Sequence, residues 1–149
     1  MTSIRDTMEQ HHRHCDDGFA AAENAVQRGN WGDAAAAFAG FAGDLETHFG
    51  AEETVLFPAF EARTGTTGGP TEVMRAEHEQ MRGLLRQMKQ GLEARDGDAF
   101  GGAAETLLVL MQQHNMKEEH ILYPMCEQAL GADADLVRRL DGVLQLRAA

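Results

Sequence analysis

The sequence is poor in the residues on which several protein classes depend. Its 149 residues include two cysteines, Cys15 and Cys126, which are too few for a framework of disulfides. Only 13 residues are Lys or Arg and the net charge is −11, which argues against a partner such as nucleic acid or an anionic membrane surface. No segment approaches the ~20 consecutive apolar residues of a membrane span. Residues 1–13 contain no apolar run typical of a signal peptide. We therefore expect a cytoplasmic protein with reduced thiols.

Runs of β-branched residues are also nearly absent, whereas Ala, Leu, Met, Glu and Gln are abundant. Helix formers at this density favour an all-α fold. A chain of this length with 43% hydrophobic residues is long enough to bury a sizeable core as one domain. We expect residues 1–149 to form a single domain, with a bundle over about 3–130 and a short extra C-terminal helix over about 133–146.

Turn-forming residues divide the chain into four long helical segments. We expect helices over 4–28, 31 to about 63, 70 to about 95, and 98 to about 123, with Asp98 as the N-cap of the fourth. Pro58 and Pro124 should kink or end the helices near them. Asp133 or Asp135 would cap the short fifth helix. Long helices joined by short turns favour an antiparallel up-down four-helix bundle.

One motif occurs twice along the chain. Residues 48–58 and 114–124 both read H-x-x-x-E-E-x-x-L-[FY]-P, and the second copy follows the first by 66 residues. The same spacing relates His12 to His78. The matched set is His12, His48 and Glu52 in the first half and His78, His114 and Glu118 in the second. Counted from the turns, these residues fall at nearly one level of a bundle, and a His and a Glu four residues apart share a helix face.

Four imidazoles and two carboxylates are costly to bury unless a partner holds them. A metal is such a partner, and imidazole with carboxylate suits iron, manganese or zinc. Six ligands in two matched halves fit two ions better than one, with Glu52 and Glu118 as bridges, as other four-helix bundles arrange them. A structural bundle that binds a divalent metal adventitiously remains an alternative.

Neighbouring residues compete with these six or supplement them. His11 and His14 flank His12, but only His12 obeys the 66-residue spacing. Three further residues are candidates to complete the coordination: Asp16, Glu119 and Tyr123. Asp16 alternatively orients His12 from outside the ligand set. Glu53 and Glu119 point about 100° away from the Glu that each follows. Their simpler interpretation is therefore as surface charges, and bonding to a ligand His from outside is the alternative.

The two motifs resemble those of the hemerythrin-like (HHE cation-binding) domains. The resemblance covers the chain from His12 to about Leu130. It rests on His12, on the two H-x-x-x-E motifs with their following Leu-Phe-Pro and Leu-Tyr-Pro, and on Glu77-His78. It implies a four-helix bundle around a non-haem di-iron centre, with His12 and His48 on one iron and His78 and His114 on the other. The ligand set is more similar to the bacterial and iron-sensing members than to the oxygen carriers.

Two positions depart from the oxygen-carrying hemerythrins. Those proteins have a fifth His four residues before the one matched by His78, where this chain has Met74. Their last motif would select Glu119, whereas the internal repeat selects Glu118. With a ligand fewer, the resemblance implies a more open centre that senses or binds O₂, nitric oxide or iron itself rather than carrying O₂ reversibly. The alternative is a di-iron enzyme that handles peroxide or nitric oxide, or repairs iron centres under stress. A protein partner or a homodimer is left open.

Overall fold

The computed structural model of the protein describes residues 3–131 and 133–148, and every regular element within them is helical. The elements are α1 (Ile4–Gln27), α2 (Trp31–Ala51), the π-helical η1 (Glu52–Leu56), α3 (Phe57–Thr64), α4 (Pro70–Glu93), α5 (Gly97–Lys117), the π-helical η2 (Glu118–Leu122), α6 (Tyr123–Leu130) and α7 (Ala134–Ala148). The expected all-α class is confirmed for these residues. None of the described helices combines the length and apolarity that crossing a bilayer requires.

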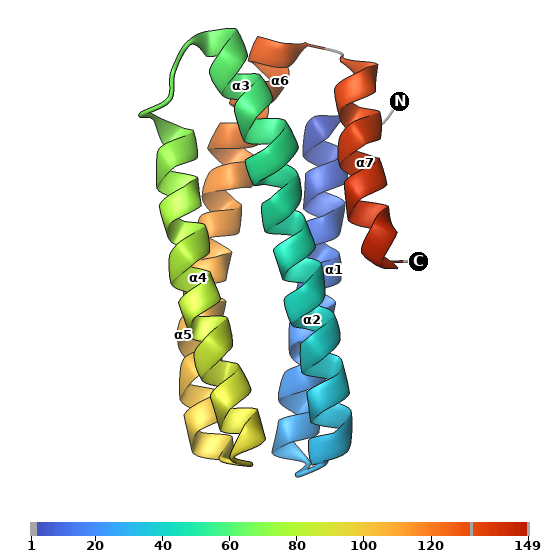
Figure 1. Ribbon diagram of the computed structural model, residues 1–149, viewed down its shortest axis with the longest axis vertical. Helices are drawn as coiled ribbons and strands as arrows, with labels where there is room; N and C mark the ends of the chain where they lie inside the picture. Colours follow the sequence, from blue (N-terminus) through green and yellow to red (C-terminus); the bar gives the residue numbers. More distant parts are fainter. Residues whose placement is uncertain (1–2, 132, 149) are drawn as a thin grey trace.

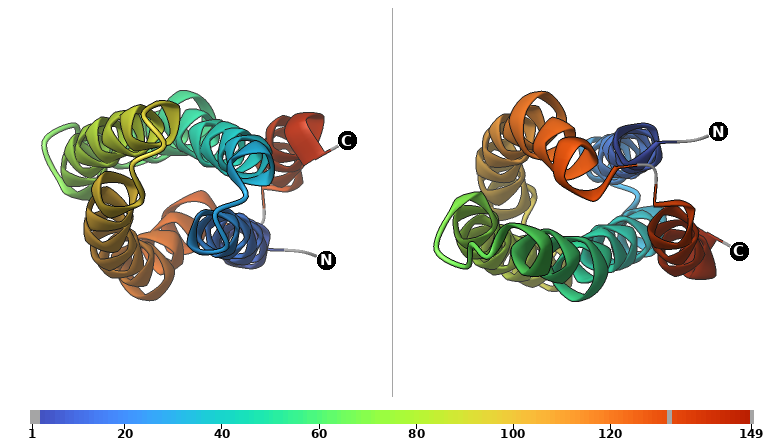
Figure 2. Two further views of the ribbon diagram at one scale, coloured as in Figure 1. Left: turned by 90° about the horizontal axis from the view of Figure 1, so that it is seen from below. Right: turned by 90° about the horizontal axis from the view of Figure 1, so that it is seen from above.

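The long helices lie side by side as a helical bundle (Figure 1). α1 packs along α2, and α4 packs along α5, with the connecting turn of each pair at the same end of the molecule. Viewed along its length, the bundle is closed by contacts of α2 with α4 and of α1 with α5 (Figure 2). α7 lies outside this ring, against α1, α2 and η1.

Side chains cap the helices close to the expected positions. Ser3 Oγ accepts the Asp6 N–H at 3.0 Å and Asn30 Oδ1 accepts the Asp33 N–H at 3.2 Å. The cap of α5 is Asp96, whose Oδ1 accepts from Ala99 N at 3.0 Å, so the prediction of Asp98 was wrong. The turn closes earlier than expected because Arg95 adopts a positive φ of 50° and the Asp96 N–H bonds back to the Gly91 carbonyl at 2.8 Å.

The two prolines, near which a kink or a helix end was expected, are accommodated without ending the helical path. A π-helical turn precedes each proline, and the chain then continues as α3 to Thr64 or as α6 to Leu130. Pro58 has no N–H with which to bond a carbonyl of the preceding turn, so a wider turn relieves both the missing donor and the steric clash. The Glu53 carbonyl accepts instead from Arg75 Nη1 at 3.4 Å.

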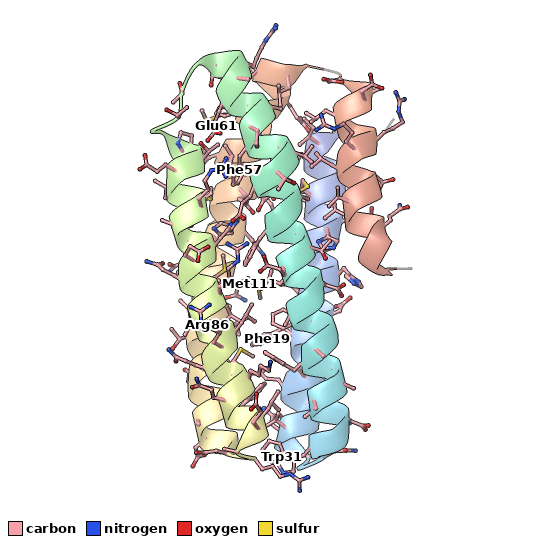
Figure 3. The ribbon with its side chains drawn as sticks, viewed as in Figure 1. Phe19, Trp31, Phe57, Glu61, Arg86 and Met111 are labelled. Atoms are coloured by element: carbon pink, nitrogen blue, oxygen red, sulfur yellow. The ribbon has the colours of Figure 1, made fainter. Side chains whose placement is uncertain are left out.

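The core consists of two apolar layers with a polar level between them. The lower layer includes Phe19 and Met111, which point into the bundle from facing helices (Figure 3). The upper layer includes Phe57 and the leucines of α7, Leu136, Leu140 and Leu144. These leucines recur at four-residue intervals, so they line one side of α7. Asp133 Oδ1 caps α7 by accepting from Leu136 N at 3.1 Å, as one of the two expected caps.

The close approach of α4 to α5 predicts opposite effects for two glycine substitutions. A Cβ on Gly91 would lie 2.7 Å from Phe100 N and 3.0 Å from its Cα, so Gly91→Ala must push two helix backbones apart. A Cβ on Gly40, an exposed helical residue, would meet no atom within 4 Å. We expect Gly40→Ala to stabilise the fold by about 0.5–1 kcal/mol through helix propensity. Gly91→Ala should destabilise it, and denaturant unfolding of both variants is the measurement. A Gly91→Ala variant as stable as Gly40→Ala would contradict the close packing.

Candidate metal centre

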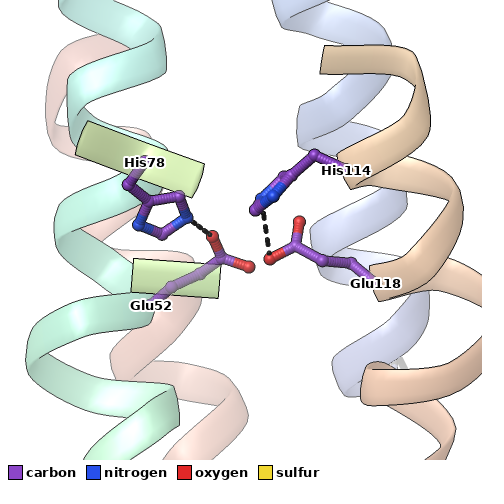
Figure 4. A group of neighbouring side chains, drawn as sticks. All are labelled: Glu52, His78, His114 and Glu118. Carbon is purple, nitrogen blue, oxygen red and sulfur yellow. Dashed lines mark hydrogen bonds and ion pairs between the residues drawn. The ribbon is translucent and has the colours of Figure 1, made fainter. Parts of the chain in front are cut away.

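The six residues selected by the repeat come together at the polar level of the core. None of them is more than 3% exposed, and Glu52, His78 and Glu118 are fully buried. They form two overlapping groups in which one ligand atom per residue lies within 4.8 Å of the others. One group is Glu52, His78, His114 and Glu118 (Figure 4), and the other is His12, His48 and Glu118. Glu118 belongs to both groups.

The position of each cluster residue along its helix explains how it reaches the core. α1 and α4 contribute one histidine each, near the middle of the helix, and the repeat places these two at matching positions. α2 and α5 contribute a histidine in their last turn, and the following π-helical segment begins with the glutamate. Consecutive residues of a helix project in different directions around its axis. Glu52 enters the cluster while Glu53 reaches the edge of the bundle.

Two atoms in the group of Glu52, His78, His114 and Glu118 form no hydrogen bond within the protein. His78 Nε2 lies 3.0 Å from Glu52 Oε1. His114 Nε2 lies 3.3 Å from Glu118 Oε2, yet both atoms are buried and neither finds a hydrogen-bond partner. Buried polar atoms without partners are rare because leaving one unpaired is costly. An imidazole nitrogen and a carboxylate oxygen that converge in this way fit the donor set of a metal ion.

A tyrosine hydroxyl lies beside the group of His12, His48 and Glu118. His12 Nε2 lies 3.0 Å from Glu118 Oε1, and His48 Nε2 faces Glu52 and Glu118 from 3.7 and 3.9 Å. The Tyr123 hydroxyl lies between these groups, 2.8 Å from Glu52 Oε2, 2.9 Å from Glu118 Oε1 and 3.2 Å from His12 Nε2. The phenol therefore donates to a carboxylate inside the cluster. The residue of the first half that corresponds to Tyr123 in the repeat is Phe57, which carries no hydroxyl.

The Nδ1 atoms of the four histidines face away from the cluster and also have hydrogen-bond partners. Glu53 Oε2 and Glu119 Oε2 bond Nδ1 of His78 and His12, each at 2.7 Å. Of the two interpretations open for Glu53 and Glu119, bonding to a histidine of the cluster is the one observed. Such partners orient the ring so that its Nε2 faces inward.

The other two outward partners were missed by sequence reasoning. Glu77 Oε1 lies 2.8 Å from His114 Nδ1, and Glu77 also pairs with Lys117. His11 Nδ1 lies 2.9 Å from His48 Nδ1, where one ring donates and the other accepts. The signal was present in the repeat, because position 77 follows position 11 by the same 66 residues. The residue types differ, an imidazole in one half and a carboxylate in the other, which conceals the match.

Burial and neighbouring charges shift the pKa values of the cluster residues in different directions. Burial and then the charge of Glu118 raise the pKa of Glu52. Burial opposes ionisation of Glu118 too, but the charge of His114 and hydrogen bonds in the cluster lower its pKa. For Tyr123, burial and the two carboxylates raise the pKa well above its usual value, so its hydroxyl keeps its proton. The two carboxylates cannot both ionise readily without added positive charge, which metal ions would supply.

The remaining candidates lie outside the cluster. Asp16 is exposed and belongs to neither group of converging atoms. His14 is also exposed and pairs with Asp44 at 2.8 Å, so His12 alone of the three neighbouring histidines presents Nε2 to the cluster. Met74 is buried one turn before His78, in the upper apolar layer. Cys15 and Cys126 are both free and buried.

The histidines predict how the stability of the metal-free protein depends on pH. Burial lowers the pKa of His48 to about 3 and that of His11 to about 4, so the unfolded chain binds more protons than the native one between about pH 4 and 6.5. Stability should therefore fall on acidification through this window, by up to about 1.4 kcal/mol per pH unit for each proton.

The opposite sign applies to His12 at alkaline pH. Burial lowers its pKa, but the hydrogen bonds that His12 donates to Glu118 and Glu119 outweigh burial and raise the pKa to about 9. Its stabilisation is complete below pH 6.5 and is lost as the pH rises through 9. Urea unfolding in the presence of chelator should thus give maximal stability near pH 6.5. A profile that is flat from pH 4.5 to 9 would contradict these assignments.

Comparison with known proteins identifies the family of the chain. Residues 3–126 match the family model described as the hemerythrin HHE cation binding domain. No match was found among curated proteins or among solved structures. The matched segment spans most of the chain, from the cap of α1 into α6, and contains all six residues of the buried His/Glu cluster. The chain belongs to the hemerythrin HHE cation-binding domain family.

Proposed function

We propose that the protein binds two iron ions in the buried His/Glu cluster and uses them to sense or bind a small ligand. One ion would take His12 and His48, and the other His78 and His114, with Glu52 and Glu118 between them. The ligand would be O₂, nitric oxide or peroxide, or iron availability itself would be the signal. The family match and the convergence of these six residues support this assignment.

One observation carries the proposal: His114 Nε2 and Glu118 Oε2 lie 3.3 Å apart in a fully buried site, and neither atom forms a hydrogen bond. A structural bundle would be more stable with apolar residues at these positions, because every buried polar atom without a partner costs free energy. Their retention beside four other titratable side chains is explained by a bound cation. Iron suits this mixture of imidazole and carboxylate, and the scarcity of thiolate disfavours structural zinc.

The residues around the cluster would prepare it for this role. A pair of iron ions supplies redox-active Lewis-acid centres for a small ligand. The chain orients the imidazoles through Glu53, Glu77, Glu119 and His11, and holds the Tyr123 proton at the hydroxyl oxygen beside Glu52. The apolar layers above and below the polar level keep bulk water from the cluster.

The scaffold that we propose is an antiparallel up-down four-helix bundle with a short extra C-terminal helix, forming one domain over residues 1–149. The packing of α1 on α2 and of α4 on α5 supports it. We place the protein in the cytoplasm, where reduced thiols persist, because both cysteines are free.

A second function is favoured by the position of Tyr123. An enzyme that reduces peroxide or nitric oxide needs protons at its centre. The Tyr123 hydroxyl, which keeps its proton in the metal-free cluster, lies 2.8–2.9 Å from both carboxylates and would become a proton donor if bound cations lowered its pKa. Turnover assays with peroxide and with nitric oxide separate the two functions. Wild-type turnover that is lost in Tyr123→Phe, with iron retained, would establish the enzyme; no turnover leaves the binding function.

Iron content is the direct test of the centre. Anaerobically reconstituted wild type should hold about two iron ions per chain and melt at a higher temperature than chelated protein, since metal binds the folded state. His114→Ala should lose about one ion, and Glu118→Ala, whose carboxylate belongs to both groups, should lose both. His14→Ala is the control, because His14 is exposed and outside the cluster. One zinc per chain, or equal melting temperatures with and without metal, would refute the assignment.

The position of Met74 predicts how quickly the reduced protein is oxidised by air. Met74→His would add an imidazole one turn before His78 on the same helix face, filling a coordination position that O₂ or water otherwise reaches. We expect the variant to oxidise at least several-fold more slowly, and Met74→Leu to match the wild type. Stopped-flow spectra of the reduced proteins mixed with O₂ measure this. A wild type whose reduced form survives as long as that of Met74→His would mean that another residue, Tyr123 first, already fills the position.

A further inference from the structure

The two groups of converging atoms in the buried cluster differ in the donors that they offer to an ion. The four-residue group is Glu52, His78, His114 and Glu118, and the three-residue group is His12, His48 and Glu118. In the four-residue group, His114 Nε2 and Glu118 Oε2 lie 3.3 Å apart and form no hydrogen bond. An ion bound to these two atoms displaces no partner from them, so this group is the better prepared of the two.

The nitrogens of the three-residue group already have a partner, the Tyr123 hydroxyl. This oxygen lies 3.2 Å from His12 Nε2 and 3.3 Å from His48 Nε2. An ion bound to the same two nitrogens has to replace the hydroxyl as their partner, and the lost interactions reduce its affinity. At the position that corresponds to Tyr123 in the repeat, Phe57 has no hydroxyl with which to compete.

The outer partners of the histidines decide which ring nitrogen carries the hydrogen. A neutral imidazole has one N–H, so it can bind a metal through Nε2 only when the hydrogen is on Nδ1. Three of the histidines place Nδ1 against a carboxylate: His12 against Glu119, His78 against Glu53, and His114 against Glu77. An ionised carboxylate can only accept, so it holds the hydrogen on Nδ1 and leaves the lone pair of Nε2 free for an ion.

His48 is the exception, because its outer partner is the ring of His11. The two Nδ1 atoms lie 2.9 Å apart, so one ring donates and the other accepts. If His11 donates, the hydrogen of His48 is on Nε2, and that nitrogen cannot bind an ion. If His48 donates, the hydrogen of His11 is on its Nε2, which is buried and has no partner. Leaving a buried N–H unpaired costs free energy, so His48 becomes a ligand only at a cost that Glu77 spares His114.

Charge near the four-residue group acts in the opposite direction but more weakly. Arg82 bonds both oxygens of Glu53 at 3.0 Å, and Lys117 pairs with Glu77. These cations repel a metal ion, but each is compensated by the carboxylate that it contacts. The Lys117 side chain is also 44% exposed, so water and salt screen its charge. The donors and hydrogen positions inside the cluster therefore decide which group binds more tightly.

We propose that the four-residue group binds the first iron ion, and that His11 and Tyr123 make the three-residue group at least about tenfold weaker. This inference rests on the proposed function, because it assumes that the cluster takes two iron ions. His11 acts as a positioning residue through the hydrogen of His48, and Tyr123 acts as a competitor for the inner nitrogens. At iron concentrations between the two dissociation constants, the protein therefore holds a single ion.

The test compares the affinity of each group alone for Fe(II). Repulsion between two ions would separate the binding steps even in equivalent groups, so the two repeat-related variants His48→Ala and His114→Ala are used. Anaerobic equilibrium dialysis against buffered Fe(II) gives the dissociation constant of the ion that each variant retains. His48→Ala keeps the four-residue group and should bind its ion as tightly as the first step of the wild type. His114→Ala keeps the three-residue group and should bind at least about tenfold more weakly.

Exchanging the outer partners tests why the two groups differ. Added to His114→Ala, His11→Glu gives His48 a carboxylate and should tighten the remaining ion about tenfold or more. Tyr123→Phe in the same background should tighten it too, because no hydroxyl then competes for the nitrogens. Added to His48→Ala, Glu77→His should weaken the remaining ion by a similar factor. Glu105→His, the same exchange at an exposed position of α5, is the control and should change neither step.

The outcomes separate this inference from the proposed function. Circular dichroism verifies that each variant is folded. A wild type that binds no iron refutes the proposed function and this inference with it. Two ions bound by the wild type, with equal affinities in His48→Ala and His114→Ala or a tighter ion in His114→Ala, overturn this inference alone. Unchanged or weaker binding on adding His11→Glu or Tyr123→Phe also overturns it, because these residues would then not limit the three-residue group.

Discussion

The burial of six ionisable side chains at one level of a helical core is the constraint on which the rest of the structure depends. Imidazoles and carboxylates removed from water must find partners, and the protein supplies them in two layers. Inside, the Nε2 atoms and carboxylate oxygens face one another within the reach of a metal ion. Outside, Glu53, Glu77, Glu119 and His11 hold the Nδ1 atoms. Apolar layers above and below complete the enclosure.

The two consecutive glutamates that begin each π-helical turn have different roles. In each half the first glutamate enters the cluster, while the next bonds a histidine on another helix from the bundle edge. The following proline makes the wider turn favourable, because it cannot donate to the preceding turn. The motif H-x-x-x-E-E-x-x-L-[FY]-P thus combines a His/Glu pair of the cluster, a glutamate that bonds a histidine of another helix, and a π-helical turn before the proline.

The two halves are related by the repeat but are not equivalent. Both histidines of the second half, His78 and His114, have carboxylate partners, whereas His48 of the first half has the neutral ring of His11. A carboxylate partner makes an imidazole a more basic ligand than a neutral partner does. Tyr123 adds a hydroxyl between the two carboxylates, and Phe57 provides none. Two ions in this cluster would therefore meet different surroundings.

The sequence alone determined the helical class, the repeat and the identity of the six converging residues, because helix propensity is local and the 66-residue spacing carries the match between halves. It also identified His12 among three neighbouring histidines. The tertiary structure decided what depends on contacts between helices. Only the packed bundle brings Glu77 to His114, His11 to His48 and Tyr123 to both carboxylates, over separations of 37, 37, 71 and 5 residues. It also placed α7 against α1, α2 and η1, which the local sequence pattern of α7 does not specify.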